Sequence, residues 1–422
     1  MKISAGLILV LALLGFCNCA TWAVLVAGSN GFSNYRHQAD ICHAYQTLIK
    51  GGLPASNIIV FSYDDIAHNI QNPVKGKIFN KPNGNDVYAG CVIDYKGKDV
   101  TPQNFLNVLK QNSAAMSKIG TGRVLKSTNA DKVFINFADH GAPGLIAFPS
   151  SYLYATDLTP VLNGMWTAKQ YQECTFYLEA CESGSMFNTF PTNQKLYAVT
   201  AANPDESSWA AYCPPDDLAG GKHIGSCLGD LFSVNWMENT DATNTTQETL
   251  QQQYQIVTQL TNLSHVMQYG DLSFTSESVN NFVGNQKATV AQEERKASTF
   301  VSSRDNLLAY LINRHNKLNN KRTQAALNRE INSRKMYDRI FRVVSNMPGK
   351  TLKKAETTDF ECYKTAISTL EKGCGRTSDY GLKYFRNLYD ICAEGSINKR
   401  RLFVMLKNEC RKHNKQQKRI KA

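Results

Sequence analysis

The 422-residue sequence has no run of 18 apolar residues after its first 20 residues, so we predict no membrane-spanning segment there. It has no Cys-x-x-Cys pair and no histidine-rich stretch, which argues against a zinc site, and we expect neither a metal nor another cofactor. Internal repeats are also absent, which excludes a repeat architecture. The remaining possibility is a globular chain, 42% hydrophobic, with room for one large and one smaller domain.

The first 20 residues have the pattern of a secretory signal peptide. A lysine precedes the short apolar run Ala5–Phe16, and small residues follow up to Ala20. The run is too short to cross a membrane. We therefore expect cleavage within a residue or two of Ala20 and entry into the secretory pathway. Asn244 and Asn262 each begin an N-glycosylation sequon, which fits such a chain.

The stretch Thr175–Met186 begins as an apolar, aromatic-rich run typical of a buried strand and continues through Cys181 into Ser-Gly-Ser. A cysteine at such a strand end lies at the carboxyl edge of the sheet, where open α/β folds bind ligands. A buried structural cysteine is the ordinary interpretation. The charged neighbours Glu179 and Glu182 argue against it here.

A second strand of the same form, Asp131–Ala138, leads to His140 and Gly141. If the two strands are parallel neighbours, His140 and Cys181 lie on one edge and within reach of each other. Cysteine and histidine form the simplest nucleophilic pair, in which the thiolate attacks and the imidazole moves protons. A lone histidine is more often structural, but this paired arrangement favours catalysis.

These two motifs, Phe-Ala-Asp-His-Gly (137–141) and Glu-Ala-Cys-Glu-Ser-Gly-Ser (179–185), resemble those of the legumains, the asparaginyl endopeptidases among the caspase-like cysteine peptidases. The resemblance extends to further motifs and spans more than half of the chain; these motifs are residues 28–40, 99–106, 201–208 and 228–236. The final third resembles the prodomain of that family more weakly. The resemblance implies an α/β fold, with a caspase-like, mainly parallel sheet flanked by helices, and a small all-α C-terminal prodomain.

We expect four parts in this chain: a signal peptide (1–20), a caspase-like cysteine peptidase domain (21–285), an activation peptide or linker (286–316) and a helical, disulfide-tied prodomain (317–422). The lack of a later apolar run disfavours the membrane-anchored transamidase relatives of the legumains. Four cysteines in the tail of a secreted protein suggest two disulfides, and spacing alone allows three connectivities. The resemblance implies Cys362–Cys392 and Cys374–Cys410. Whether Cys213 pairs with Cys227 stays open.

The resemblance also implies a mechanism. Cys181 attacks the carbonyl carbon to form a thioester, and His140 protonates the leaving amine and then activates water. The backbone N–H groups of Gly141 and Cys181 form the oxyanion hole. Asn34 orients His140, although by its sequence context alone Asn34 is equally typical of a turn.

The pocket for the substrate side chain follows from the same resemblance. A side-chain amide both donates and accepts hydrogen bonds, so its pocket must offer both kinds of partner. Arg36 is the implied donor, Glu179 and Asp230 are the acceptors, and His37 and Ser208 belong to the wall. A structural ion pair between Arg36 and an acid is the alternative. The pocket predicts cleavage after Asn, and after Asp only in acid, where protonated Asp mimics Asn.

Charge is unevenly distributed along the chain. Residues 301–422 hold 28 Lys and Arg against 11 Asp and Glu, a net charge of +17, whereas the remainder holds 19 against 24, a net charge of −5. A basic tail suits a polyanionic partner or a solvated helix face. A third interpretation fits better: the tail inhibits the acidic part of its own chain and is released when carboxylates are protonated. We expect no nucleic-acid and no membrane partner.

Local signals predict several helices. Thr101-Pro102 and Thr159-Pro160 each match a helix start with proline in the first turn, and the second helix is expected to end near Tyr171. Residues 307–347 form a strongly charged helical segment, and the asparagines within 311–320 are candidate self-cleavage points.

We therefore predict a secretory-pathway cysteine endopeptidase that cleaves after Asn, is made as an acid-activated zymogen, and acts in an acidic lysosome- or vacuole-like compartment or outside the cell. Two alternatives stay open. A thioester can be intercepted by an amine, which would make the enzyme a peptide ligase. The fold could also be inert in a secreted polyanion-binding protein.

Overall fold

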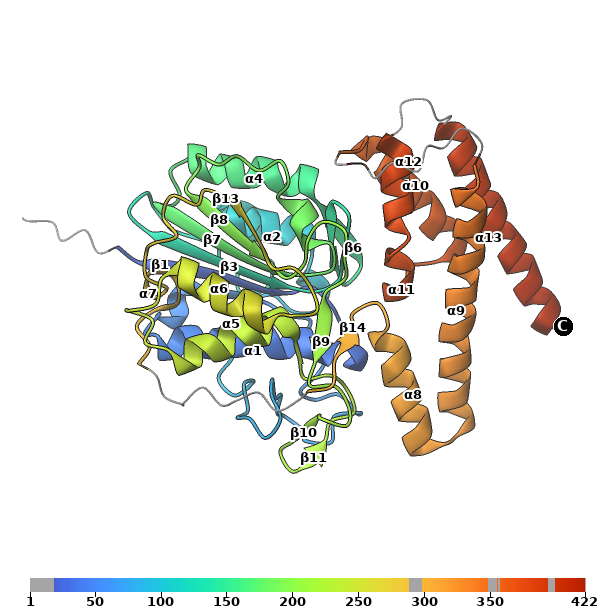
Figure 1. Ribbon diagram of the computed structural model, residues 1–422, viewed down its shortest axis with the longest axis horizontal. Coiled ribbons are helices and arrows are strands. Elements are labelled where there is room, and N and C mark those ends of the chain that lie inside the picture. The colour runs from blue at the N-terminus through green and yellow to red at the C-terminus, as the bar shows by residue number, and fades with distance from the viewer. Residues whose placement is uncertain (1–18, 288–297, 348–354, 356, 394–398, 422) are drawn as a thin grey trace, which may run out of the picture.

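The computed structural model describes residues 19–287, 298–347, 355, 357–393 and 399–421. Most of the expected signal peptide and part of the expected linker, residues 288–297, lie outside the described residues. The described chain forms an α/β body and a helical tail beside it (Figure 1). Within these ranges, no helix combines the length and the apolar character needed to cross a bilayer.

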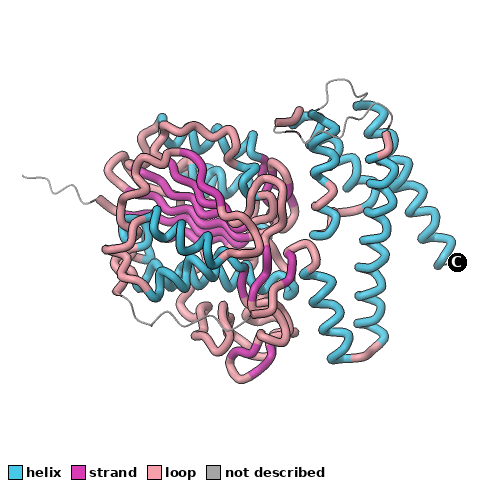
Figure 2. Tube along the Cα trace, in the orientation of Figure 1, coloured by secondary structure: helices cyan, strands magenta, loops and turns pink. Residues whose placement is uncertain are grey.

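A six-stranded sheet forms the centre of the body (Figure 2). Its order is β13-β8-β7-β3-β1-β2, and all neighbours are parallel except β13 and β8. Central strands are buried along their whole length because helices cover both faces of the sheet. This confirms the predicted mainly parallel sheet. The strands are β1 (Thr21–Ala27), β2 (Ile58–Phe61), β3 (Lys132–Ala138), β7 (Glu173–Glu179), β8 (Leu196–Thr200) and β13 (Met267–Gly270).

Helices α2 and α4 pack on one face of the sheet, and α1, α5, α6 and α7 pack on the other. Each face therefore buries its own apolar cluster, which holds the strand tips at fixed positions. The helices of the body are α1 (Tyr35–Lys50), α2 (Pro102–Leu109), α3 (Ser113–Met116), α4 (Ala155–Thr167), α5 (Leu231–Ala242), α6 (Leu250–Leu260) and α7 (Asn280–Val283).

The two Thr-Pro pairs differ in their outcome. Helix α2 begins at Pro102, and Thr101 Oγ1 accepts a hydrogen bond from Asn104 N at 3.2 Å, as predicted. The second prediction is wrong, because α4 begins earlier, directly after strand β6, and Pro160 lies inside it. Asp157 in the first turn favours that earlier start, and Pro160 is exposed, so the backbone carbonyl without a partner faces water.

Short strands form the rim of the body. A three-stranded sheet of order β4-β5-β6 follows His140, and another of order β12-β9-β14 joins the body to the segment that precedes the tail (Figure 1). The short strands are β4 (Gly141–Ala142), β5 (Leu145–Phe148), β6 (Ser151–Tyr154), β9 (Trp209–Ala211), β10 (Leu218–Ala219), β11 (Lys222–His223), β12 (Gly229–Asp230) and β14 (Val301–Ser302).

All the regular elements in the described part of the tail are helices, which confirms the predicted all-α region. Its apolar core also packs against Leu145, Tyr152 and Tyr154 of the body. The segment predicted to be helical and strongly charged is helical and contains two helices, because Asn319 has a left-handed φ of 40° and Asn320 caps the following helix. The helices are α8 (Asn306–Leu318), α9 (Lys321–Ser345), α10 (Phe360–Cys374), α11 (Asp379–Leu382), α12 (Phe385–Ala393) and α13 (Lys399–Lys421).

Four disulfides link eight of the eleven described cysteines. In the tail the structure joins Cys362 to Cys392 and Cys374 to Cys410, the pairs that the resemblance implies. Cys213 pairs with Cys227, which the sequence left open, and Cys42 pairs with Cys91, which we did not predict.

Candidate active site

The tips of β3 and β7 bring His140 and Cys181 to one edge of the sheet. The strands are parallel neighbours whose register ends with Ala138 opposite Glu179, so each residue lies two positions beyond a paired strand end. The backbones touch there: a Cβ atom on Gly141 would lie 2.3 Å from the carbonyl oxygen of Cys181. A glycine is therefore required at 141 for this approach.

The hydrogen bonds around His140 define its tautomer. Asn34 uses its amide nitrogen to donate to the carbonyl of Asn30 at 3.1 Å, so Asn34 Oδ1 is an acceptor. His140 Nε2 lies 3.0 Å from that oxygen and must carry the hydrogen. Nδ1 is buried and has no partner among the described residues, which leaves it free to exchange a proton. Burial lowers the pKa of His140 to about 4, opposed by Asp379.

Cys181 is fully buried in this form of the protein. Ser208 N donates to its sulfur at 3.4 Å, and Ser208 Oγ lies 3.7 Å away. Burial raises the pKa of the thiol, and the nearby Arg304 opposes that shift. The structure therefore holds the thiol protonated and covered.

A polar pocket lies beside this pair. Arg36 Nε donates to Asp230 Oδ1 at 2.7 Å, with both side chains buried. Glu179 Oε2 accepts from the N–H and the hydroxyl of Ser233, at 3.0 and 3.1 Å, in the first turn of α5. Three of the buried atoms without a hydrogen-bond partner in the described chain are Arg36 Nη2, Glu179 Oε1 and Asp230 Oδ2; His37 Nε2, which also lacks one, is 3.4 Å from Asp230 Oδ2. The pocket thus offers one donor and two acceptors.

The two predicted wall residues also lie here. His37 Nδ1 is 2.6 Å from Ser29 Oγ, and its ring packs edge-on against the ring of His140 with centroids 5.1 Å apart. Ser208 lies against Cys181. All the residues that the sequence proposes for catalysis and substrate binding are therefore brought together at one sheet edge; they are Asn34, Arg36, His37, His140, Gly141, Glu179, Cys181, Ser208 and Asp230.

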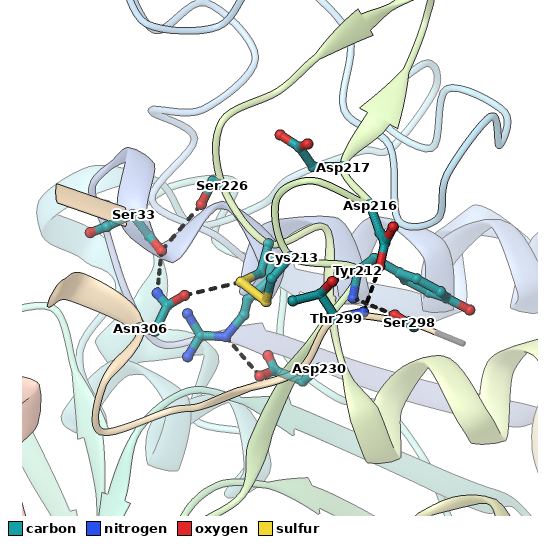
Figure 3. Close-up of a disulfide and its surroundings, with 12 residues drawn as sticks. Ser33, Tyr212, Cys213, Asp216, Asp217, Ser226, Asp230, Ser298, Thr299 and Asn306 are labelled. Carbon is teal, nitrogen blue, oxygen red and sulfur yellow. Dashed lines mark hydrogen bonds and ion pairs between the residues drawn. A yellow bond between two sulfur atoms is a disulfide. The ribbon is translucent and has the colours of Figure 1, made fainter. Parts of the chain in front are cut away.

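A segment that precedes the tail covers this edge. Strand β14 pairs antiparallel with β9, and Ser303 N then donates to Ser208 O at 3.1 Å. The hydroxyls of Ser303 and Ser208 lie 3.2 Å apart. Asn306 fixes the end of the segment: its amide donates to Ser33 O at 2.6 Å, and its Oδ1 lies 3.2 Å from the disulfide sulfur of Cys227 (Figure 3). The covering segment is thus residues 301–306.

Arg304 binds the covering segment to the edge of the sheet. It is buried, and its Nη2 donates to Glu182 Oε2 at 2.5 Å and to the carbonyl of Gly141 at 2.6 Å. From the tail, Asp379 Oδ2 comes within 3.4 Å of His140 Nε2. Our sequence reasoning missed Ser303, Arg304 and Asp379, and no local signal marks them, since Arg304 is one of 28 basic residues in that part of the chain.

One group of described residues has the spacing of a metal site, namely His37, Asp139 and His140, whose ligand atoms all lie within 4.8 Å of one another. Burial raises the pKa of Asp139 well above its usual range, so its carboxyl is neutral and a poor ligand. His140 Nε2 is also engaged by Asn34. The donor set therefore fits proton transfer better than metal binding.

The two predicted glycosylation sites differ in exposure. Asn262 is exposed, whereas Asn244 is half-buried and accepts hydrogen bonds from Thr246 through Oδ1.

Comparison with known proteins gives consistent matches. Residues 21–285 match the peptidase C13 family, and residues 326–410 match the legumain prodomain. The chain is 42% identical over 405 residues to the vacuolar-processing enzyme delta-isozyme of Arabidopsis thaliana, covering 89% of this chain and 87% of that one. It is 39% identical over 390 residues to legumain of Bos taurus, covering 88% of each. A caspase-1 structure from Spodoptera frugiperda overlaps with a TM-score of 0.37 and 9% identity, over 64% of this chain and 92% of that one, too weak a likeness to support an argument.

Proposed function

This chain belongs to the peptidase C13 family and is a cysteine endopeptidase with a prodomain, and we propose that it cleaves proteins after Asn and is made as an acid-activated precursor. The observation that carries the specificity is the set of three unpartnered atoms in the pocket. Arg36 Nη2 donates to the oxygen of a substrate amide, while Glu179 Oε1 and Asp230 Oδ2 accept from its NH₂ group. Ionised Asp offers no hydrogens to those acceptors, so it is rejected until acid protonates it.

The proposed chemistry uses the free nitrogen of His140. Nδ1 takes the thiol proton as Cys181 Sγ bonds to the carbonyl carbon, and the oxyanion accepts hydrogen bonds from the N–H groups of Gly141 and Cys181. His140 then gives that proton to the leaving amine as the C–N bond breaks, leaving a thioester. His140 then takes a proton from water as the water oxygen bonds to the thioester carbon. The C–S bond breaks and the sulfur takes that proton from His140, so the acid leaves and the thiol is restored. Asn34 keeps the hydrogen on Nε2 throughout.

The covering segment accounts for the inactive precursor. Residues 301–306 occupy the edge where a substrate strand would pair with β9. Ser303, whose side chain has no amide group, takes the position beside Ser208. Two ion pairs add complementary charge between tail and body, Lys364–Asp157 and Arg386–Asp205, each at 2.9 Å. The proposed division keeps the peptidase domain at 21–285, the linker at 286–316 and the prodomain at 317–422.

Acid release follows from the protonation of His140. The pKa of the His140 imidazole is about 4 when covered, against an ordinary value of 6.5. Lowering the pH between these values therefore protonates His140 in the open form only, which stabilises the open form relative to the closed one. Glu182 acts in the opposite sense, since burial raises its pKa to about 6 and protonation favours the closed form. The displacement of His140 is the larger of the two, so the pair together favours opening in acid. An acidic compartment reached through the secretory pathway suits this behaviour.

The test is a time course at acid pH that compares the precursor with Cys181→Ala. Fluorogenic peptides with Asn, Gln or Asp before the scissile bond report specificity, and mass spectrometry reports loss of the tail. We expect only the unmodified chain to shed its tail and then to cleave after Asn. Tail loss without Asn cleavage refutes the pocket assignment. Heparin binding at physiological salt with no cleavage at any pH favours an inert polyanion-binding protein.

A further inference from the structure

A chain of buried polar side chains continues from the substrate pocket into the body. Arg36, Asp40 and His43 lie on one face of α1, spaced by four and three residues. Asp40 is fully buried against Asp230, whose backbone N–H lies 3.3 Å from Asp40 Oδ2. Asn80, in the loop after β2, connects Asp40 to His43. The proposed mechanism uses none of Asp40, His43 and Asn80.

The direction of each hydrogen bond in this chain can be assigned. Asn80 Nδ2 donates to the carbonyl of Leu228 at 3.0 Å, and because a carbonyl can only accept, the amide orientation is fixed. The same nitrogen donates to Asp40 Oδ1 at 2.7 Å. Asn80 Oδ1 then accepts from His43 Nδ1 at 2.7 Å, and His43 Nε2 lies 2.9 Å from Asp241 Oδ2 near the surface. Asp40 Oδ1 is therefore an acceptor.

The proton balance of the pocket follows from this assignment. Asp40 also hydrogen-bonds the carboxyl of Asp230, and two carboxylates in contact cannot both be ionised. Burial, Asp230 and Glu179 raise the pKa of Asp40 well above its usual range, so Asp40 holds the proton. Asp230 N shares its hydrogen between Asp40 Oδ1 and Oδ2, at 3.4 and 3.3 Å, and Oδ1 also accepts from Asn80 at 2.7 Å. The proton is therefore assigned to Oδ2, the weaker acceptor. Arg36 is the cation that faces this group and is bound to Asp230.

Close packing at Gly229 keeps Asp40 and Asp230 together. A Cβ atom on Gly229 would lie 2.4 Å from Val234 Cγ1, 2.8 Å from Asn80 Nδ2 and 3.1 Å from Asp40 Oδ1. Gly229 precedes Asp230 in β12, so the absence of a side chain there allows Asp40 and Asn80 to come up against the back of the pocket.

We propose that Asp40 is a positioning residue for substrate specificity: it stays protonated, donates to the carboxylate of Asp230, and so keeps Asp230 ionised and turned to accept from the substrate amide. This inference rests on the proposed cleavage after Asn. Asp40 does not touch the substrate. A purely structural role would instead make Asp40 important for folding and leave selectivity unchanged.

Two substitutions separate these roles. Asp40→Asn places an NH₂ where the carboxyl O–H lies and keeps an oxygen for Asn80, whereas Asp40→Ala removes both. We expect kcat/KM of Asp40→Asn on the Asn peptide to stay within about threefold of the unmodified enzyme between about pH 4.5 and 7. For Asp40→Ala we expect a loss of about tenfold or more, mainly through KM, with reduced preference for Asn over Gln and Asp.

The matched control is Asp94→Asn, another buried aspartate of the body. Asp94 accepts from Val60 N, Thr121 Oγ1 and Arg123 Nη1, so all of its partners are donors and an amide fits poorly. This variant should lose thermal stability and keep its selectivity. All variants are first compared by circular dichroism and by alkylation of Cys181.

Two outcomes overturn the inference, and a third overturns the proposed function. If kcat/KM of Asp40→Asn on the Asn peptide falls about tenfold or more, Asp40 acts as a charge rather than as a donor. This result is sufficient even if Asp40→Ala fails to fold. If Asp40→Ala folds and keeps its KM and selectivity, the residue does not position Asp230. If the unmodified enzyme does not cleave after Asn, the proposed function itself is refuted. If the unmodified enzyme cleaves after Asn and both Asp40 variants match it in kcat/KM and selectivity, only this inference is refuted.

Discussion

Replacing Arg304 with alanine tests the closed precursor most directly. Arg304 is the only residue of the covering segment 301–306 that donates a charge-assisted hydrogen bond to Glu182, and it also donates to the carbonyls of Gly141 and Asp379. Arg304→Ala removes these three bonds and leaves Glu182 as a buried carboxyl without its ion-pair partner. The open form, in which Glu182 meets water, loses nothing comparable. The substitution should therefore favour opening without altering the catalytic groups.

The magnitude follows from burial. The side chains of Arg304 and Glu182 are 5% and 8% exposed, so screening by solvent is small. Breaking such a buried pair by removing one partner costs ~3 kcal/mol. Because the cost falls on the closed form, the open fraction should rise on the order of 100-fold.

Alkylation of Cys181 measures the open fraction. The thiol is fully buried when closed, so iodoacetamide reacts only through opening, and the rate at neutral pH reports the open population. In the open form of the unmodified precursor, Arg304 no longer lies near the thiol. The thiol of Cys181 is therefore equally reactive in the open forms of the precursor and of Arg304→Ala. Mass spectrometry distinguishes Cys181 from Cys174, the other free cysteine buried in the body.

The control for lost charge is Arg342→Ala, at an exposed arginine of α9. It should alkylate at the rate of the unmodified precursor. The double variant Glu182→Gln with Arg304→Ala should increase the open fraction by less than the sum of the two single effects, expressed as free energies. If Arg304→Ala reacts no faster than Arg342→Ala, the covering segment does not hold the site closed, and our account of inhibition is wrong.

Two further predictions concern pH and self-cleavage. Burial raises the pKa of Asp40 and Asp139 well above their unfolded values, so the stability that they contribute is present in acid and is lost as the pH rises. The free energy of unfolding of Cys181→Ala should therefore fall above about pH 6.5, where unfolded histidines are already neutral, by ~1.4 kcal/mol per pH unit for each carboxyl that stays protonated. The melting temperature should fall with it, and Asp40→Asn should reduce the slope; a flat curve would show that these carboxyls ionise in place. Among the asparagines of residues 311–320, Asn313 and Asn316 lie within α8, whereas Asn319 and Asn320 lie between two helices, so mass spectrometry should find the cut after Asn319 or Asn320. The double alanine variant should keep its tail, and cleavage inside α8 would contradict this expectation.

The central fold could be predicted because its signals are local. Apolar runs that end at His140 and Cys181 mark buried parallel strands, and the register of β3 and β7 then places the two residues together. Thr101-Pro102 predicted α2 correctly. The same pair at Thr159-Pro160 misled us, because strand β6 leads directly into α4 and a proline is tolerated on its exposed side.

The pocket and the closed state could be predicted only in part. Arg36, Glu179 and Asp230 come from α1, β7 and β12, and only the family resemblance connected them before their contacts were known. Arg304 and Asp379 contact the site from segments that lie more than 120 residues after Cys181 in the sequence. Such contacts depend on tertiary packing, and composition revealed only that the tail is basic.

The position of the Asn319–Asn320 turn determines how many molecules take part in activation. Asn306 is bound to Ser33 beside the active site, and the 13-residue helix α8 extends from there for ~20 Å before it reaches the turn (Figure 1). While α8 is folded, the turn cannot enter the active site of its own chain, so a second molecule must make the cut. Activation should then be second order in enzyme: a dilute precursor stays dormant even in acid, and the first few active molecules convert the remainder autocatalytically.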